Sequence, residues 1–188
     1  MARLTRDGDS GAPITIRPAS TEDGPALQEI ERLAGEQFRD VGLPDVADDE
    51  PSSTAELADY ATAGRSWVAV DAAGSPIGYV LVDAVDGNAH IEQVSVRPDH
   101  QGAGVGRALI DRVCTWAVEA GMAAVTLTTF EHVPWNAPLY RHLGFRVLAE
   151  REIGPELLAV REAERAHGLD PTTRACMRLD VGARHRAP

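Results

Sequence analysis

Three glycines on alternate positions, Gly102, Gly104 and Gly106, separate a run of strand-forming residues from an amphipathic pattern. Glycine has no side chain to keep a ligand's oxygen atoms away from backbone N–H groups, and it readily adopts positive φ values. A helix that begins directly after such a loop adds the partial positive charge of its N-terminus. This combination predicts a binding site for phosphate groups.

The spacing of the glycines argues against two common nucleotide-binding loops. A nicotinamide-binding Rossmann loop is disfavoured, because the glycines are spaced G-x-G-x-G and no strand ending in an acid follows at the expected place. A Walker A loop is absent, because no Gly-Lys-Ser/Thr follows. The main alternative to phosphate binding is a turn that only lets strand and helix pack closely.

Alternating and helical patterns along the chain predict the elements that position this loop. The expected strands are 14–18, 66–71, 76–85, 88–96, 123–130, 145–150 and 173–181. The expected helices are 20–34, 54–63, 107–120, 136–143 and 153–168. Turns at Gly74 and at Asp86-Gly87 predict an antiparallel meander of the second, third and fourth strands. The order is βααβββαβαβ, with an inserted helix before a last strand.

Length and composition indicate one globular domain. With 188 residues, 44% of them hydrophobic and 25% charged, the chain can bury one core, and we expect it to occupy residues 13–181. The polar ends, 1–12 and 182–188, are expected to be flexible tails. The two cysteines, Cys114 and Cys176, lack the spacing of a disulfide framework, so we expect reduced, buried thiols.

The charge balance and hydropathy limit the partners. A formal net charge of −11 makes nucleic acid a poor partner, because binding to phosphate backbones depends on clustered Lys and Arg. No apolar run approaches the roughly 20 residues that cross a bilayer, and the N-terminus lacks the apolar stretch of a signal peptide. We therefore expect a cytoplasmic protein without a membrane partner; the oligomeric state is left open, a homodimer included.

Two motifs resemble one known family. Gln101–Gly106 matches the Q/R-x-x-G-x-G/A signature of the GNAT superfamily of N-acetyltransferases, and Val94–Pro98 looks like that family's fourth strand and its exit. The segment NAPLYRHLGF, 136–145, resembles the second motif, in which an asparagine and a tyrosine precede Gly-Phe. The resemblance is close over 90–145 and looser over 14–181. In many members more residues separate the asparagine from the tyrosine, and the segment 151–171 is extra.

The resemblance implies a fold and a co-substrate. The fold is α/β (α+β), with a mixed, mostly antiparallel twisted central sheet of about seven strands flanked by helices, in which the fourth and fifth strands splay. The co-substrate is acetyl-CoA, and no metal is implied. Backbone groups of Val94, Ser95 and Val96 would pair with the pantetheine arm. The residues assigned to the pyrophosphate are Gln101, Gly102, Ala103, Gly104, Val105, Gly106 and Arg107, and Asn136 and Tyr140 complete the coenzyme set.

The implied reaction is transfer of an acetyl group to a primary amine by direct attack through a tetrahedral intermediate. Tyr140 resembles the family's general acid for the departing thiolate; the alternative is a core tyrosine that packs on Phe145. The alternative for the whole chain is a non-catalytic acyl-CoA-binding sensor or regulatory module.

An alkylamine needs a route for its proton, and Glu92 is the first candidate for the base. It lies two residues from His90, and therefore on the same face of the strand, where the family often has a carboxylate acting through water. A solvated strand carboxylate or ion-pair member is an equal alternative, and His90 is a weaker candidate base. His90-x-Glu92 is not a zinc deaminase motif, because no Pro-Cys-x-x-Cys follows.

An acidic loop and the turn after the fifth expected strand are the candidates for the acceptor side. The acidic loop 45–50 corresponds to a segment that lines the acceptor side in this family, which suggests a cationic amine, either a small molecule or a peptide N-terminus or lysine. Glu131-His132 could assist there, or could be a solvated loop. Asn136 is most simply an N-cap, and Trp135 is expected either in the core or in the wall of the pocket.

Overall fold

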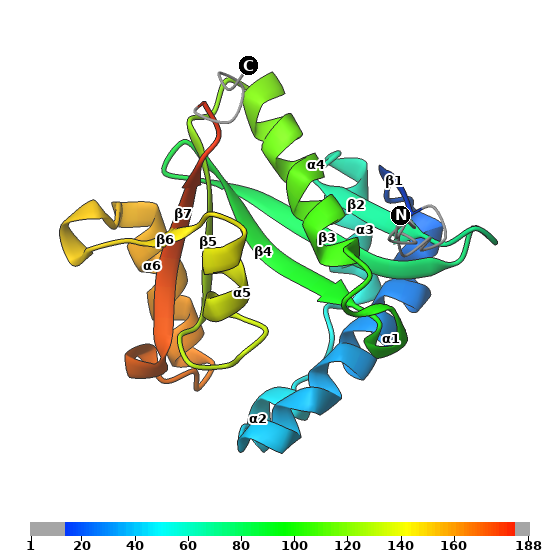
Figure 1. Ribbon diagram of the computed structural model, residues 1–188, viewed down its shortest axis with the longest axis horizontal. Helices are drawn as coiled ribbons and strands as arrows, with labels where there is room; N and C mark the ends of the chain where they lie inside the picture. Colours follow the sequence, from blue (N-terminus) through cyan, green and yellow to red (C-terminus); the bar gives the residue numbers. More distant parts are fainter. Residues whose placement is uncertain (1–13, 183–188) are drawn as a thin grey trace, which may run out of the picture.

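A seven-stranded sheet organises the computed structural model, which describes residues 14–182 (Figure 1). The strand order is β1-β2-β3-β4-β5-β7-β6, and every neighbouring pair is antiparallel except β4 and β5. The strands are β1 (Thr15–Pro18), β2 (Ser66–Val70), β3 (Pro76–Val85), β4 (Asn88–Val96), β5 (Ala124–Phe130), β6 (Arg146–Val147) and β7 (Arg174–Asp180). The predicted mixed, mostly antiparallel sheet is confirmed.

Helices cover both faces of this sheet. They are α1 (Gly24–Gly35), α2 (Pro44–Ala47), α3 (Thr54–Thr62), α4 (Val105–Glu119), α5 (Ala137–His142) and α6 (Pro155–Ala166). Alternation along β2 shows the division: Trp67 and Ala69 pack in the cluster with α4, whereas Val68 and Val70 pack in the cluster with α1 and α3. A third cluster joins α6 to β3 and β7.

Local sequence signals account for the element boundaries. Asp86 and Gly87 both have positive φ, 49° and 70°, which produces the two-residue turn that pairs Val85 with Asn88. At the start of the first helical segment, the Ser20 N–H donates to the Asp23 carboxylate at 2.7 Å. Arg17 forms an ion pair of 2.7 Å with the same carboxylate and ties this helix start to β1.

Three expectations need adjustment. The strand expected at 145–150 is paired only over Arg146–Val147, because the chain enters a 3₁₀ turn at Glu150–Glu152. The expected loop before α3 contains a 3₁₀ segment, Glu36–Val41, and the short α2, which begins at Pro44. The expected tails, 1–12 and 182–188, lie outside the described residues, except for Gly182, which forms an exposed turn.

None of the helices between residues 14 and 182 has the length and apolar character needed to span a membrane. Cys114 and Cys176 are both buried free thiols, as the sequence predicts.

Candidate active site

β4 and β5 separate in the middle of the sheet. Their parallel pairing covers only Ala89–Ile91 of β4 and Val125–Leu127 of β5. Beyond this point β4 continues to Val96, paired with β3 on one side only, and β5 continues to Phe130, paired with β7. The backbone groups on the free side of residues 94–96 therefore face an opening between the two strands.

The separation begins at a β-bulge. Leu81 pairs with Gln93 and Val82 with Ile91, which leaves Glu92 as the extra residue of β4. A bulge interrupts the alternation of side chains and bends the strand. The side chains of His90 and Glu92 both lie among the charges of Asp83 and Glu164, but they differ in exposure. Glu92 lines the cavity, whereas His90 is buried, with Nδ1 3.0 Å from Thr126 Oγ1.

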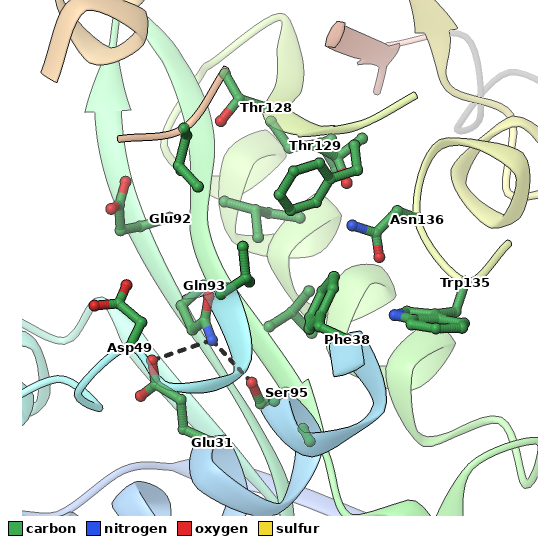
Figure 2. A pocket seen from close by; sticks show the side chains of 18 of the residues that line it. Glu31, Phe38, Asp49, Glu92, Gln93, Ser95, Thr128, Thr129, Trp135 and Asn136 are labelled. Carbon is green, nitrogen blue, oxygen red and sulfur yellow. Dashed lines mark hydrogen bonds between the residues drawn. The ribbon is translucent and has the colours of Figure 1, made fainter. Parts of the chain in front are cut away.

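A cavity of about 700 Å³ passes through this opening. It is lined by Ile110 of α4 from one face of the sheet and by Glu31 of α1 from the other. Figure 2 shows Glu92, Asp49 and Glu31 along one wall, with Asn136 and Trp135 on the facing side. One continuous space therefore connects the glycine-rich loop with the segments before β2.

The glycine-rich loop has the geometry that its sequence predicts. Gly102 and Gly104 have φ values of +79° and +83°, and a Cβ at either position would meet no atom within 4 Å, so the space before them is open. α4 begins at Val105, and the Ala108 N–H is bonded to the Gly104 carbonyl at 3.0 Å. The amides of residues 105–107 therefore precede the hydrogen bonds of the helix and point out of its N-terminus.

Residues assigned to the coenzyme line two neighbouring hollows, except Ala103, which lines neither. Val94, Ser95, Val96, Gln101, Gly106, Asn136 and Tyr140 line the main cavity. Gly102, Gly104, Val105 and Arg107 line a smaller hollow of about 220 Å³ that shares Val96, Gln101 and Gly106 with it. The Arg107 guanidinium is exposed and lies 3.7 Å from the Asp111 carboxylate.

Tyr140 lies both in the core and at the cavity. Its ring packs edge-on against Phe145, with centroids 5.5 Å apart, and its side chain also lines the cavity. Burial raises the pKa of the phenol to about 12, an effect that the charge of Arg174 partly offsets. Within residues 14–182 its hydroxyl has no hydrogen-bond partner, so it remains available to a ligand.

The expectation that the Asn136 side chain caps a helix is wrong. It occupies the N-cap position of α5, and its carbonyl accepts the Tyr140 N–H at 3.0 Å, but its side chain makes no capping hydrogen bond. The amide instead points into the cavity (Figure 2). The neighbouring Trp135 lines the cavity as expected, and its buried indole N–H has no partner in the described part of the chain.

Glu92 is the lining carboxylate beside the separation of β4 and β5. The walls of the cavity raise the pKa of Glu92 by desolvation, and the negative charges of Asp83 and Glu164 raise it further. His90 differs, because burial lowers the pKa of its imidazole to about 4 and it is not exposed to the cavity. Only Glu92 of this pair is placed to exchange a proton with a ligand.

Three of the six carboxylates that line the cavity, Glu31, Asp83 and Glu164, come from segments that the sequence did not single out. The six lining carboxylates are Glu31, Asp49, Glu50, Asp83, Glu92 and Glu164. Asp83 accepts a hydrogen bond of 2.7 Å from the Tyr60 hydroxyl and pairs with Arg65. The clearest missed signal is Glu31, because its spacing of four from Leu27 places a carboxylate on the buried side of α1.

The remaining candidates lie as follows. Of the acidic loop 45–50, Asp49 and Glu50 line the cavity, whereas Asp48 pairs with Arg39. Glu131 and His132 do not line it; Glu131 lies 3.7 Å from the Arg141 guanidinium and His132 is exposed. Among residues 14–182, no group of three or more His, Cys, Asp or Glu side chains is arranged to hold a metal ion.

The sequence matches a known family model. Residues 27–145 match the acetyltransferase (GNAT) family. The chain is 34% identical over 146 residues to streptothricin acetyltransferase of Streptomyces lavendulae, covering 74% of this chain and 72% of that protein. It is 29% identical over 87 residues to the peptidyl-lysine N-acetyltransferase YjaB of Escherichia coli strain K12, which is 46% of this chain and 53% of YjaB.

Solved structures share the fold. Rv2747 from Mycobacterium tuberculosis, crystallised with CoA and NLQ, superposes with a TM-score of 0.66 at 21% identity. The superposition covers 88% of this chain and 98% of that one. The fold of this chain therefore also occurs in solved structures.

Proposed function

Since the chain belongs to the acetyltransferase (GNAT) family, we propose that it transfers the acetyl group of acetyl-CoA to a primary amine. The observation that carries the proposal is the cavity through the sheet, which joins the glycine-rich loop to a wall of carboxylates. A phosphate-bearing thioester fits one end of this space and an amine fits the other.

The residues present fit coenzyme A. The amides before and within the first turn of α4 would hold the pyrophosphate, because they lack helical partners and lie at the positive end of the helix dipole. The free side of β4 at residues 94–96 would pair with the amide groups of the pantetheine arm, as an added strand would. Acetyl-CoA would supply the activated acetyl group as a thioester.

Glu92 would relieve the amine of its proton. An alkylamine with a pKa near 10.4 is neutral about once in two thousand molecules at pH 7, so a base beside the attacking nitrogen increases the reactive fraction. Because the pKa of Glu92 is raised, it lies closer to neutral pH than the ordinary pKa of a glutamate, and this makes the carboxylate a stronger base. The proton reaches it directly or through one water molecule, and the neutral amine attacks the carbonyl carbon.

Tyr140 would act on the leaving sulfur. A phenol whose pKa is about 12 stays protonated throughout the neutral range, so its hydroxyl can donate to sulfur as negative charge develops there. An N–C bond forms and the C–S bond breaks. The ammonium loses two protons in all: Glu92 takes the first before the attack and releases it to solvent, and then takes the second as the tetrahedral intermediate collapses. The leaving sulfur receives one proton from Tyr140, which solvent restores.

A screen of primary amines tests the proposal. The purified chain is incubated with acetyl-CoA and each amine, free thiol is followed, and the product is checked for the mass of one added acetyl group. Thiol release that depends on both the amine and the protein supports acetyl transfer. Thermal stabilisation by acetyl-CoA with no thiol release for any amine would contradict it and favour a non-catalytic acyl-CoA sensor.

A further inference from the structure

The charges that line the cavity are not balanced. Asp83 pairs with Arg65, and Glu164 pairs with Arg174 at 2.5 Å. The lining Arg32 is 2.8 Å from Glu29, outside the cavity. Of the six carboxylates that line the cavity, four have no ion-pair partner among residues 14–182: Glu31, Asp49, Glu50 and Glu92.

Glu31 differs from the other three because it is half-buried and held in one orientation. The Tyr79 hydroxyl donates to its Oε2 at 2.5 Å, and the Ser52 N–H donates to the same oxygen at 3.3 Å. The Gln93 amide donates to Oε1 at 3.3 Å and to the Ser95 hydroxyl at 2.9 Å. These neutral donors fix the carboxylate without cancelling its charge.

This arrangement is costly without a cation. A carboxylate that loses water without gaining a positive partner is destabilised, and burial, with a further contribution from the charge of Asp49, raises the pKa of Glu31. A positively charged group bound beside Glu31 would stabilise the desolvated carboxylate. The reacting amine cannot serve, because it must be neutral when it attacks.

We infer that the acceptor is a small dicationic amine, in which a second ammonium group, remote from the reacting one, binds Glu31. The inference rests on the proposed function and narrows it. Gln93 directly follows Glu92 in β4 and donates to Glu31, so the binding position for the second charge adjoins the proposed base along one wall. Asp49 and Glu50 extend the negative wall beside it.

A matched pair of amines tests this directly. 1,5-Diaminopentane and hexylamine have equal chain lengths and differ by one terminal ammonium in place of a methyl group. With the intact chain and acetyl-CoA, kcat/KM for the diamine is expected to exceed that for hexylamine by at least about tenfold. Titration of each amine into the CoA-saturated chain gives a second readout that needs no turnover.

Variants test whether Glu31 causes the preference for the diamine over hexylamine. Glu31→Gln keeps an oxygen that accepts from Tyr79 but removes the charge, and is expected to lower the diamine-to-hexylamine ratio by at least about fivefold. Glu22→Gln removes an exposed charge outside the cavity and should leave the ratio unchanged. If Glu31→Gln fails to fold, Asp49→Asn on the exposed loop is expected to lower the same ratio.

The outcomes separate the two proposals. Equal use of both amines, or an unchanged ratio in both Glu31→Gln and Asp49→Asn, overturns the second-charge site while leaving acetyl transfer intact. Absence of thiol release with every amine overturns acetyl transfer. In that case tighter binding of the diamine than of hexylamine, lost in Glu31→Gln, still supports the site, and equal binding overturns it.

Discussion

The carboxylate of Asp86 accepts a hydrogen bond of 2.9 Å from the backbone N–H of Leu157. Its other oxygen accepts the N–H of Glu156 at 3.1 Å, so one side chain of the β3–β4 turn caps the start of α6. α6 carries Glu164, which lines the cavity. A turn far away in the sequence thus anchors the helix that forms one wall of the cavity.

Removing this cap should loosen α6. Asp86→Asn keeps a residue that tolerates positive φ but loses charge and one acceptor, and is expected to lower the free energy of unfolding by about 1 kcal/mol. Gly154→Ala should act in the same direction, because the new Cβ would collide with the Asp86 carboxylate. Denaturant unfolding measures both changes.

A control variant separates the effect of the Asp86 cap on the cavity from a general loss of stability. Asp71 accepts the N–H groups of Ala73 and Ser75 in the β2–β3 turn, away from α6. Asp71→Asn should also destabilise the chain but leave KM for the amine unchanged, whereas Asp86→Asn should raise it. Equal KM values in the two variants would rule out a link between the cap and the acceptor wall.

Gly104→Val should abolish coenzyme binding. Gly104 has a φ of +83°, and a side chain there would project into the open space before the α4 amides, where a phosphate is expected. Gly74→Val is the matched control, because Gly74 has a φ of +82° in a hairpin turn, also with open space around it. Calorimetry with CoA should show binding by the Gly74 variant only; retained binding by folded Gly104→Val would contradict the phosphate site.

Tyr140→Phe should lower kcat by about 100-fold. The ring would still pack on Phe145, so CoA affinity and the unfolding free energy should change little. Steady-state kinetics and CoA titration of the same preparation make the comparison. A variant with normal kcat would show that Tyr140 is only part of the core.

Glu92→Gln should remove an acidic limb from the pH profile. The pKa of Glu92 is raised, so the active, deprotonated carboxylate is lost as pH falls through a value above 4.5. In the wild type, kcat/KM between about pH 5 and 9 should fall toward acid more steeply than protonation of the amine alone requires. Glu22→Gln should keep this limb; a Glu92→Gln profile parallel to the wild type would exclude Glu92 as the base.

His90 should make the fold sensitive to acid. Its pKa is lowered by burial to about 4, so between about pH 6.5 and 4 the unfolded chain binds one more proton than the folded chain at this position. His90 therefore lowers the unfolding free energy as pH falls across that window, by up to about 3 kcal/mol. His90→Asn should lose this dependence, and His132→Gln, at an exposed position, should retain it.

Short-range patterns were enough for most of the fold. The Asp86-Gly87 turn, the glycines after the helices and the apolar stripe of α4 each encode a local structure through backbone sterics and burial. The glycine-rich loop could be identified in the same way, because contiguous residues supply its backbone groups. Those parts of the site that lie on one segment were therefore predictable from the sequence.

Only the tertiary structure brought Glu31, Glu92 and Glu164 to one cavity, because α1, β4 and α6 meet through packing of segments that are far apart in the chain. The bulge at Glu92 was also beyond sequence patterns, since it depends on how β4 pairs with β3. The same applies to Asn136, whose side chain could have capped α5 but faces the cavity. By itself the sequence predicted what each segment forms and a loop suited to phosphate. Pairing across distant segments decided which carboxylates face the opening, because charge acts through space and not along the chain.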